Sequence, residues 1–253
     1  MSLQPLPPHP KLDRYYRSDE ERPGVVRDLF EEGAQYYEWI CRLMSFGTGE
    51  SYRRRTLSAA GLEAGMRILD VAAGTGLVLR SAADITGRDG LAVGLDPSPG
   101  MLRECARACA APLLQGRGEQ LPFASESFEM VSMGYALRHV ADLRVLFSEF
   151  LRVLRPGGRV VVLEITQPRS PAGRWMNRLY LRTVVPGLAR MVTGAPAASR
   201  MMDYFWETIE KCVTQDVILT ALREVGFAEV SLRTRAGVLS EYQAARRDDG
   251  FAK

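Results

Sequence analysis

A carboxylate and a glycine-rich turn follow the first strongly apolar stretch of the chain. Residues 67–71 read Arg-Ile-Leu-Asp-Val, and Ala72-Ala73-Gly74-Thr75-Gly76 come next. Glycines at a turn from a strand into a helix let a ligand approach the backbone, and such a turn presents N–H groups. The dinucleotide pattern G-x-G-x-x-G is not met, because Leu79 stands three residues after Gly76. The Asp70 carboxylate would also repel a pyrophosphate, so this turn favours a cationic ligand without phosphate.

Three further residues extend this site along the chain. Asp96 ends the second apolar stretch, where a carboxylate accepts hydrogen bonds from both hydroxyls of a ribose. Met101 would pack on an adenine face, and Glu119 lies in the loop after the third stretch, at the same expected sheet edge. S-adenosylmethionine carries an ammonium and a sulfonium group and no phosphate, so these residues together favour it as cofactor. The alternatives, helix caps for the two aspartates and a core position for Met101, stay open.

Several sequence runs also carry a family resemblance. They are Asp70-Val71-Ala72-Ala73-Gly74-Thr75-Gly76, Gly94-Leu95-Asp96 with Met101-Leu102, Glu119-Gln120-Leu121-Pro122-Phe123 and Leu154-Arg155-Pro156-Gly157-Gly158-Arg159. Over about residues 29–226 the chain resembles class I S-adenosylmethionine-dependent methyltransferases. More narrowly, it resembles the UbiE-like C-methyltransferases of ubiquinone and menaquinone biosynthesis. That narrower resemblance rests on Leu43-Met44-Ser45-Phe46-Gly47, Ala136-Leu137-Arg138-His139-Val140 and Val162-Leu163-Glu164-Ile165.

The resemblance implies methyl transfer from S-adenosylmethionine to carbon or oxygen of an aromatic or isoprenoid, quinone-like small molecule. It implies an apolar acceptor. We also expect no metal, no nucleic-acid partner and a cytoplasmic location, on the grounds of composition given below. The cofactor contacts that we expect are Asp70, Ala72, Gly74, Thr75, Gly76, Asp96, Pro97, Met101, Gly118, Glu119 and Tyr135.

Ring C-methylation needs a base, because an acceptor hydroxyl must lose its proton before electron density reaches the neighbouring carbon. His139 is the first candidate, since it follows the fourth apolar stretch and an imidazole ordinarily titrates near pH 6.5. The other histidine, His9, is expected to lie in a loose tail. Arg138 would lower the pKa of a phenol or pair with a carboxylate, and Tyr37 and Glu38 would bond an acceptor hydroxyl. A satisfied loop histidine and solvent-exposed helix residues are the alternatives.

The acceptor half of the chain departs from the family pattern. The family has Asn where this chain has His139, and Arg117 stands where an acidic residue often contacts the adenine amino group. Thr208-Ile209-Glu210 replaces the family's Ser-Ile-Arg. Two other functions therefore stay open: N-methylation of a phospholipid headgroup or natural-product amine, and a non-enzymatic cofactor-binding partner in a biosynthetic complex.

Composition sets the limits within which these residues act. The 253 residues, 46% hydrophobic and 25% charged, are typical of one folded domain with an appendage. A net charge of +3 is too mild to indicate nucleic-acid binding. Four cysteines without a Cys-x-x-Cys pair and two histidines argue against a zinc site and fit a reducing compartment. No apolar stretch approaches the roughly 20 residues of a membrane-spanning helix, and the first residues do not form a secretory signal.

The elements that must position the site follow from the alternation of apolar stretches with helical patterns. The predicted strands are residues 67–71, 91–96, 112–115, 128–133, 159–165, 228–233 and 238–244. This order predicts an α/β fold with a doubly wound, mostly parallel seven-stranded Rossmann-like sheet. We expect a flexible Pro-rich tail over residues 1–24, an N-terminal helical cap over 25–60 and the cofactor-binding domain over 61–253.

One helical segment, residues 170–212, does not fit the alternation, and we expect it to be a helical lid inserted after strand five. Its apolar residues and arginines would form a channel for the acceptor or pack on the body of the domain. An amphipathic basic helix also suits a peripheral membrane contact. A homodimer is a further expectation.

Overall fold

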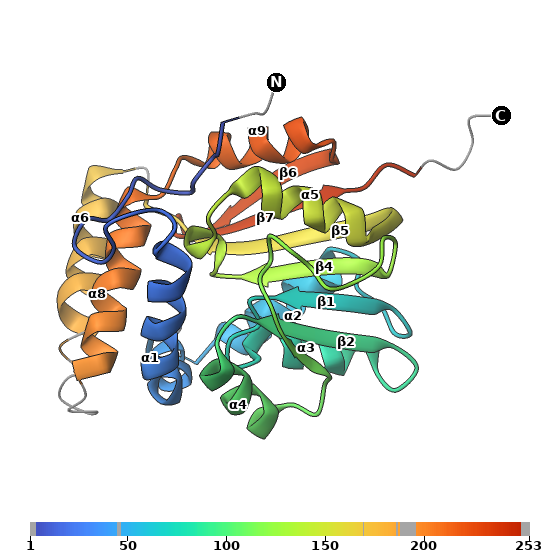
Figure 1. Cartoon of the computed structure of the whole chain (residues 1–253), viewed down its shortest axis with the longest axis horizontal. Helices are drawn as coiled ribbons and strands as arrows, with labels where there is room; N and C mark the ends of the chain where they lie inside the picture. The colour runs from blue at the N-terminus through green and yellow to red at the C-terminus, as the bar shows by residue number, and fades with distance from the viewer. Residues whose placement is uncertain (1–3, 45–46, 169, 186, 188–195, 249–253) are drawn as a thin grey trace.

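One seven-stranded sheet forms the centre of the molecule, in the order β3-β2-β1-β4-β5-β7-β6 (Figure 1). The computed structural model describes residues 4–44, 47–168, 170–185, 187 and 196–248. β1 to β5 pair in parallel, and β7 is antiparallel to both β5 and β6. The predicted doubly wound, mostly parallel sheet is therefore confirmed. The strands are β1 (Arg67–Val71), β2 (Leu91–Asp96), β3 (Leu113–Gln115), β4 (Phe128–Gly134), β5 (Leu154–Ile165), β6 (Ala228–Arg235) and β7 (Leu239–Ala245).

Helices cover both faces of the sheet, which is why its strands are nearly continuous apolar runs. Successive side chains of β1 point to opposite faces: Leu69 and Val71 belong to one buried cluster and Ile68 to the other. The first cluster includes residues of α5 (Leu143–Val153) and α9 (Gln215–Val225), and the second includes residues of α2 (Gly49–Ala59), α3 (Leu77–Thr86) and α4 (Pro99–Ala108).

A third helical layer lies at one end of the sheet (Figure 1). It contains α1 (Arg22–Met44), α6 (Pro171–Leu179), the π-helix η2 (Tyr180–Val184) and α8 (Pro196–Lys211). α1 and α8 pack closely, because a Cβ on Gly33 would lie 2.5 Å from the sulfur of Met201. Ile40, Val185 and Trp206 are buried between these helices.

The segment before α1 differs from the loose tail that its prolines suggested. Leu12 and Tyr16 are buried against Val26 and Tyr204. Extended proline-rich backbone makes no hydrogen bonds of its own, so its carbonyls are free to accept from neighbours. Those of Leu6 and Pro8 do so, from the N–H groups of Leu143 and Val213 at 3.0 and 2.8 Å. The segment therefore runs across the body of the domain as an ordered strap.

No helix within the described residues is long and apolar enough to cross a lipid bilayer.

Candidate active site

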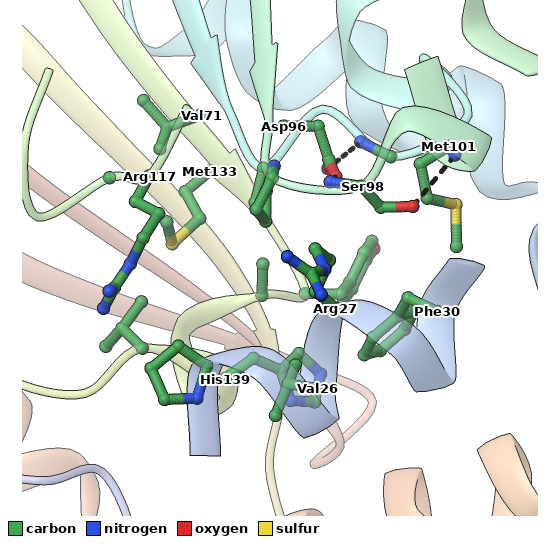
Figure 2. A pocket seen from close by; sticks show the side chains of 18 of the residues that line it. Val26, Arg27, Phe30, Val71, Asp96, Ser98, Met101, Arg117, Met133 and His139 are labelled. Atoms are coloured by element: carbon green, nitrogen blue, oxygen red, sulfur yellow. Dashed lines mark hydrogen bonds between the residues drawn. The ribbon is translucent and has the colours of Figure 1, made fainter. Parts of the chain in front are cut away.

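A pocket of about 850 Å³, including its open mouth, lies between α1 and the carboxyl ends of the parallel strands (Figure 2). Ligands of open α/β sheets collect at this edge. The lining comes from five segments: Val71, Ala72 and Gly74 after β1; Asp96, Pro97, Ser98 and Met101 after β2; Arg117, Gly118 and Glu119 after β3; Met133, Gly134, Tyr135, Ala136, His139 and Val140 at and after the end of β4; and Pro23, Val26, Arg27, Phe30 and Tyr37 of α1.

The glycine-rich turn after β1 takes the shape that the sequence predicts. Gly74 and Gly76 have φ of 57° and 85°, which only glycine adopts without strain. A Cβ on Gly76 would lie 2.6 Å from the Sγ of Cys105, so the turn sits directly on α4. Ala72 and Tyr135, at the ends of β1 and β4, are also left-handed, with φ of 55° and 61°. Such strained residues cluster at functional sites, and both line the pocket.

Asp96 lies at the centre of the pocket wall. Its two carboxylate oxygens accept from the N–H groups of Gly74 and Ser98, each at 2.8 Å. Burial raises its pKa to about 6, although these two bonds oppose the rise. An ionised carboxylate has about four acceptor positions, so two remain for the hydroxyls of a ribose.

Asp70 does not line the pocket and lies beneath the turn. Its Oδ1 accepts from the Ser132 hydroxyl at 2.7 Å, and its Oδ2 is buried with no hydrogen-bond partner among the described residues. Burial raises the pKa of this carboxyl to about 7. Thr75 and Gly76 likewise do not line the pocket. Asp70, Thr75 and Gly76, which we expected among the cofactor contacts, therefore lie outside the lining of this pocket, and their contact with the cofactor stays a prediction.

These residues fit S-adenosylmethionine. The buried carboxylate of Asp70 has an oxygen without a partner in the described part of the chain, and Asp96 offers only acceptors, which suits an ammonium, a sulfonium and a ribose. Met101 is buried in the wall beside Asp96, as a residue packing on adenine must be. Glu119 accepts from the N–H of Ala141 at 2.7 Å and so ties the loops after β3 and β4 together. The described residues hold no cluster of three or more metal-ligating side chains.

Sequence reasoning missed Glu31 of α1. This carboxylate accepts from the Ser98 hydroxyl at 2.7 Å, from the N–H of Gly100, and from Arg103 at 2.5 Å. A Cβ on Gly100 would lie 2.8 Å from the carboxylate, so glycine is what admits it to the N-terminus of α4. Glu31 fastens α1 over the cofactor end of the pocket. In the sequence, Glu31 follows Phe30, which belongs to the apolar stripe of α1. That neighbour was the available indication that Glu31 lies near the pocket.

His139 ends the short helix η1 (Leu137–His139) after β4, and its ring lines the pocket. The ring stacks on Tyr204, with centroids 5.4 Å apart, and meets Phe30 edge-on at 4.9 Å. Both ring nitrogens are buried, and neither has a partner among the described residues. Burial, reinforced by the positive charge of Arg138, lowers the pKa of His139 well below 6.5. The imidazole is therefore neutral at physiological pH, and the ordinary titration range expected from the sequence does not apply.

Arg138 is fully buried and does not line the pocket. Its guanidinium pairs with Glu164 of β5 and lies over the ring of Phe205, 4.6 Å from the centroid. Burial lowers its pKa to about 10, so it stays charged at neutral pH. Arg138 can therefore act on the pocket only by its charge and by the position of its backbone.

Arg22, at the start of α1, holds that backbone. Its Nη2 donates to the carbonyl of Arg138 at 2.9 Å and to Nε2 of His9 at 2.7 Å. Because Nε2 accepts, Nδ1 carries the proton and donates to the Pro10 carbonyl at 2.7 Å. Burial and the charge of Arg22 lower the pKa of His9 to about 4, so this ring is neutral as well. His9 is thus a buried anchor, which corrects its expected place in a loose tail.

The two predicted catalytic residues of α1 lie in different surroundings. Tyr37 lines the pocket, 6.1 Å from Phe30 between ring centroids, and burial raises its pKa well above 10. Glu38 points elsewhere and pairs with Arg80 at 2.7 Å. The structure therefore brings Tyr37 and His139 together with the cofactor residues and leaves Glu38 and Arg138 outside the lining.

The described residues of the predicted lid do not close this pocket. No described residue of 170–212 lines the pocket, whereas five residues of α1 do. Val185, one of the apolar residues of that segment, is fully buried between the helices of the third layer. Residues 186 and 188–195 of that segment lie outside the described residues, as do Ser45 and Phe46 of the family resemblance.

A model described as the ubiE/COQ5 methyltransferase family matches residues 16–245. The chain belongs to this family. It is 33% identical over 231 residues to a demethylmenaquinone methyltransferase of Clavibacter sepedonicus, covering 89% of this chain and 92% of the relative. It is 34% identical over 244 residues to one of Symbiobacterium thermophilum, covering 92% and 97%.

A solved S-adenosylmethionine-dependent methyltransferase of Aquifex aeolicus shares the fold, with a TM-score of 0.57 and 14% identity, over 77% of this chain and 89% of that one. The protein is thus an S-adenosylmethionine-dependent methyltransferase, as its sequence predicts.

Proposed function

We propose that this ubiE/COQ5 family enzyme transfers the methyl group to a ring carbon of a reduced, quinone-like acceptor of the demethylmenaquinol type. The names of the similar relatives support this acceptor class. The observation that carries the proposal is the composition of the pocket. Asp96 and Met101 form one end, and an aromatic and apolar end formed by Val26, Phe30 and His139 faces them (Figure 2). A polar cofactor and a flat apolar ring fit these two ends.

The cofactor end is held by Asp96, Met101 and the turn at Gly74. When bound, S-adenosylmethionine supplies an electrophilic methyl group on a sulfonium. Asp96 would accept the ribose hydroxyls, and the Asp70 charge beneath the turn would favour the cationic part. Glu31 would keep α1 closed on this end, so that water is excluded from the methyl group.

The acceptor end must favour loss of a hydroxyl proton, because a phenol ordinarily titrates near pH 10. Burial lowers the pKa of His139 most, and the positive charges of Arg138 and Arg22 lower it further. The same positive field favours a phenolate beside that ring, since it stabilises negative charge as it opposes an imidazolium. The neutral His139, whose two ring nitrogens have no partner among the described residues, would take the hydroxyl proton as the methyl bonds to the ring carbon, and Tyr37 would fix the ring position. The proton that the ring carbon then loses would restore the hydroxyl. Positioning and charge therefore perform most of the catalysis.

Turnover with a panel of acceptors tests this assignment. We expect methylation of a short-tailed reduced demethylmenaquinone and none of phosphoethanolamine or a phosphatidylethanolamine headgroup. Methylation of the amines instead would establish the N-methyltransferase alternative. Binding of S-adenosylmethionine without turnover of any acceptor would favour the partner-protein alternative. The cytoplasmic location and the homodimer stay predictions, and sedimentation velocity tests the second.

A further inference from the structure

Arg22, at the start of α1, holds a positive charge that no carboxylate neutralises. Its side chain is only 1% exposed. Among the described residues its guanidinium forms no ion pair, and its Nη2 donates to an imidazole nitrogen and to a backbone carbonyl. Its Nε is buried and has no partner in the same part of the chain. Burying a charge without a counter-ion is costly, so such a charge is expected where it serves an anionic group.

The neighbouring Arg138 shows how the same region neutralises a charge. Arg138 is fully buried, and its guanidinium pairs with Glu164 of β5. Two guanidinium groups and one carboxylate are therefore buried beside η1, and one positive charge is left over. The charge that is left over is that of Arg22.

The tyrosines that face Arg22 do not neutralise it. The ring of Tyr16 lies 6.0 Å from the guanidinium carbon, and the Tyr204 hydroxyl lies beside the guanidinium. Burial raises the pKa of both tyrosines, so both hydroxyls keep their protons. The carboxylates of Asp19 and Glu207 act on Tyr16, but neither forms an ion pair with Arg22. A cation–π contact lowers the cost of burying Arg22 and leaves its charge in place.

His9 of the strap holds Arg22 without adding a charge. The Nη2 of Arg22 donates to Nε2 of His9 at 2.7 Å and to the carbonyl of Arg138 at 2.9 Å. Burial and the charge of Arg22 lower the pKa of His9 to about 4, so the imidazole is neutral. A carboxylate at this position would accept the same hydrogen bond and cancel the charge. The imidazole thus fixes the guanidinium and preserves its charge.

The charge of Arg22 acts on the acceptor end of the pocket. Arg22 holds the carbonyl of Arg138, the residue directly before His139. Burial lowers the pKa of His139, and the positive charges of Arg138 and Arg22 lower it further. Pro23 and Val26, in the first turns of α1, line the pocket at the end where His139 lies (Figure 2). The N-terminus of α1 adds the positive end of a helix dipole at the same place.

We propose that Arg22, positioned by His9, supplies the counter-charge for a ring hydroxyl that is bound and ionised beside His139. Arg22 does not line the pocket, so it acts by its charge and not by contact. The site would then select an aromatic acceptor with an ionisable hydroxyl and disfavour an amine, because methylation of an amine creates a positive charge. The inference deepens the proposed function and rests on it, because that function places the acceptor hydroxyl beside His139.

A purely structural role of Arg22 would make different demands on its charge. A tie between the strap and η1 needs hydrogen-bond donors, and a neutral side chain would provide them without the cost of burying a guanidinium. A counter-charge, by contrast, fails as soon as its charge is cancelled, even when its hydrogen bonds are kept. Variants that cancel the charge and preserve the hydrogen bonds therefore separate the two roles.

A matched pair of variants at His9 makes this separation. His9→Gln and His9→Glu have side chains of the same size, and both can accept from Arg22, but only glutamate cancels the charge. The probe is 1-naphthol bound to the full chain saturated with S-adenosylhomocysteine, because the absorbance of 1-naphthol reports its ionisation. We expect bound 1-naphthol to ionise at lower pH than free 1-naphthol in the wild type and in His9→Gln.

In His9→Glu the ionisation constant of bound 1-naphthol should fall roughly tenfold. A unit charge that acts over about 10 Å at an effective dielectric constant of about 20 has an effect of this size. Lys11→Gln, which removes an exposed positive charge from the same strap, is the control and should leave the ionisation constant unchanged. Arg22→Lys should match the wild type and Arg22→Met should match His9→Glu, so the test stays decisive if His9→Glu does not fold.

Nuclear magnetic resonance of the imidazole gives a second readout that needs no acceptor. The chain has two histidines, so the imidazole that remains in either His9 variant is that of His139. The pKa of His139 should be higher in His9→Glu than in His9→Gln, because the positive field that opposes an imidazolium is cancelled.

Equal ionisation constants of bound 1-naphthol in His9→Gln and His9→Glu, or in Arg22→Lys and Arg22→Met, would overturn the inference. A wild type that does not bind the naphtholate would overturn it as well. If the wild type methylates the reduced demethylmenaquinone while these constants are equal, the proposed function stands and the counter-charge fails. If the naphtholate depends on Arg22 but no quinol is methylated, the proposed function fails and the counter-charge stands.

Discussion

Asp70→Asn removes a buried carboxylate whose charged form the cofactor-free protein tolerates poorly. Burial raises the pKa of Asp70 from 3.8 to about 7. A carboxyl group with a raised pKa binds its proton more tightly in the folded chain. Its contribution to stability is therefore complete below about pH 4 and is lost as the pH rises to about 7. A shift of about three units corresponds to about 4 kcal/mol at most.

Urea unfolding of the cofactor-free wild type and Asp70→Asn at about pH 5 and pH 8 measures this loss. The Ser132 hydroxyl, which donates to Asp70 at 2.7 Å, can still donate to the amide oxygen of asparagine, so the substitution preserves shape. We expect the variant to be more stable by about 1.5 kcal/mol at the lower pH, where the carboxyl of the unfolded chain is already ionised, and by about 4 kcal/mol at the higher pH. Asp96 titrates in both proteins, so the difference between the two curves reports the ionisation of Asp70 together with its repulsion by Asp96. Parallel curves, or a variant that is less stable at both pH values, would refute the reasoning.

The same variant should lose cofactor affinity, because the positive groups of S-adenosylmethionine favour the ionised form of Asp70. Calorimetry in buffers of different ionisation enthalpy should show proton release when the wild type binds near neutral pH. Asp70→Asn should show a smaller release and a weaker affinity. An unchanged proton count would mean that Asp70 does not sense the bound cofactor.

Three further substitutions test other parts of the site. Asp96→Ala should weaken S-adenosylhomocysteine binding by about 1.5–3 kcal/mol in calorimetry, and NAD should not bind; comparable NAD affinity would exclude the cofactor assignment. At saturating cofactor, where Asp70 and Asp96 no longer limit binding, turnover of the wild type should show no step near pH 6–7 from His139, because the pKa of His139 lies well below that range. His139→Ala should cost roughly 10²–10⁴ in turnover with little change in cofactor affinity. Near-wild-type turnover in His139→Asn would show that a hydrogen bond or shape suffices there. Val185→Ser should destabilise the fold by about 2–4 kcal/mol, since the side chain is fully buried. A raised Michaelis constant for the acceptor with unchanged stability would instead support the hypothesis that this segment is a lid.

The sheet and the cofactor turn could be predicted from the sequence because both depend on local patterns. Parallel strands buried on both faces are apolar runs of strand length, and β1 and β2 begin and end where those runs do. The turn at Gly74 and Gly76 needs a left-handed backbone, which is why glycine stands there. Asp96 was found because it ends the second apolar stretch, at the same expected edge of the sheet.

The surroundings of the acceptor could not be predicted in this way. The apolar stripe of α1 shows that Val26 and Phe30 face something apolar, but not that they face a pocket rather than the core. The buried contact of His9 with Arg22 joins the strap to α1 and leaves no local pattern. In the segment after β5, arginines among apolar residues are typical of a channel wall and of an interfacial helix alike. Tertiary packing decides each of these cases.

The central claim is that this pocket places the methyl of S-adenosylmethionine against a ring carbon of a quinol. Reaction with cofactor carrying a carbon-13-labelled methyl, followed by nuclear magnetic resonance of the isolated product, measures this directly. We predict one labelled methyl bonded to a ring carbon of the short-tailed quinol, and its disappearance in Asp96→Ala at limiting cofactor. A label on oxygen or nitrogen, or no transfer while the cofactor remains bound, would contradict the account.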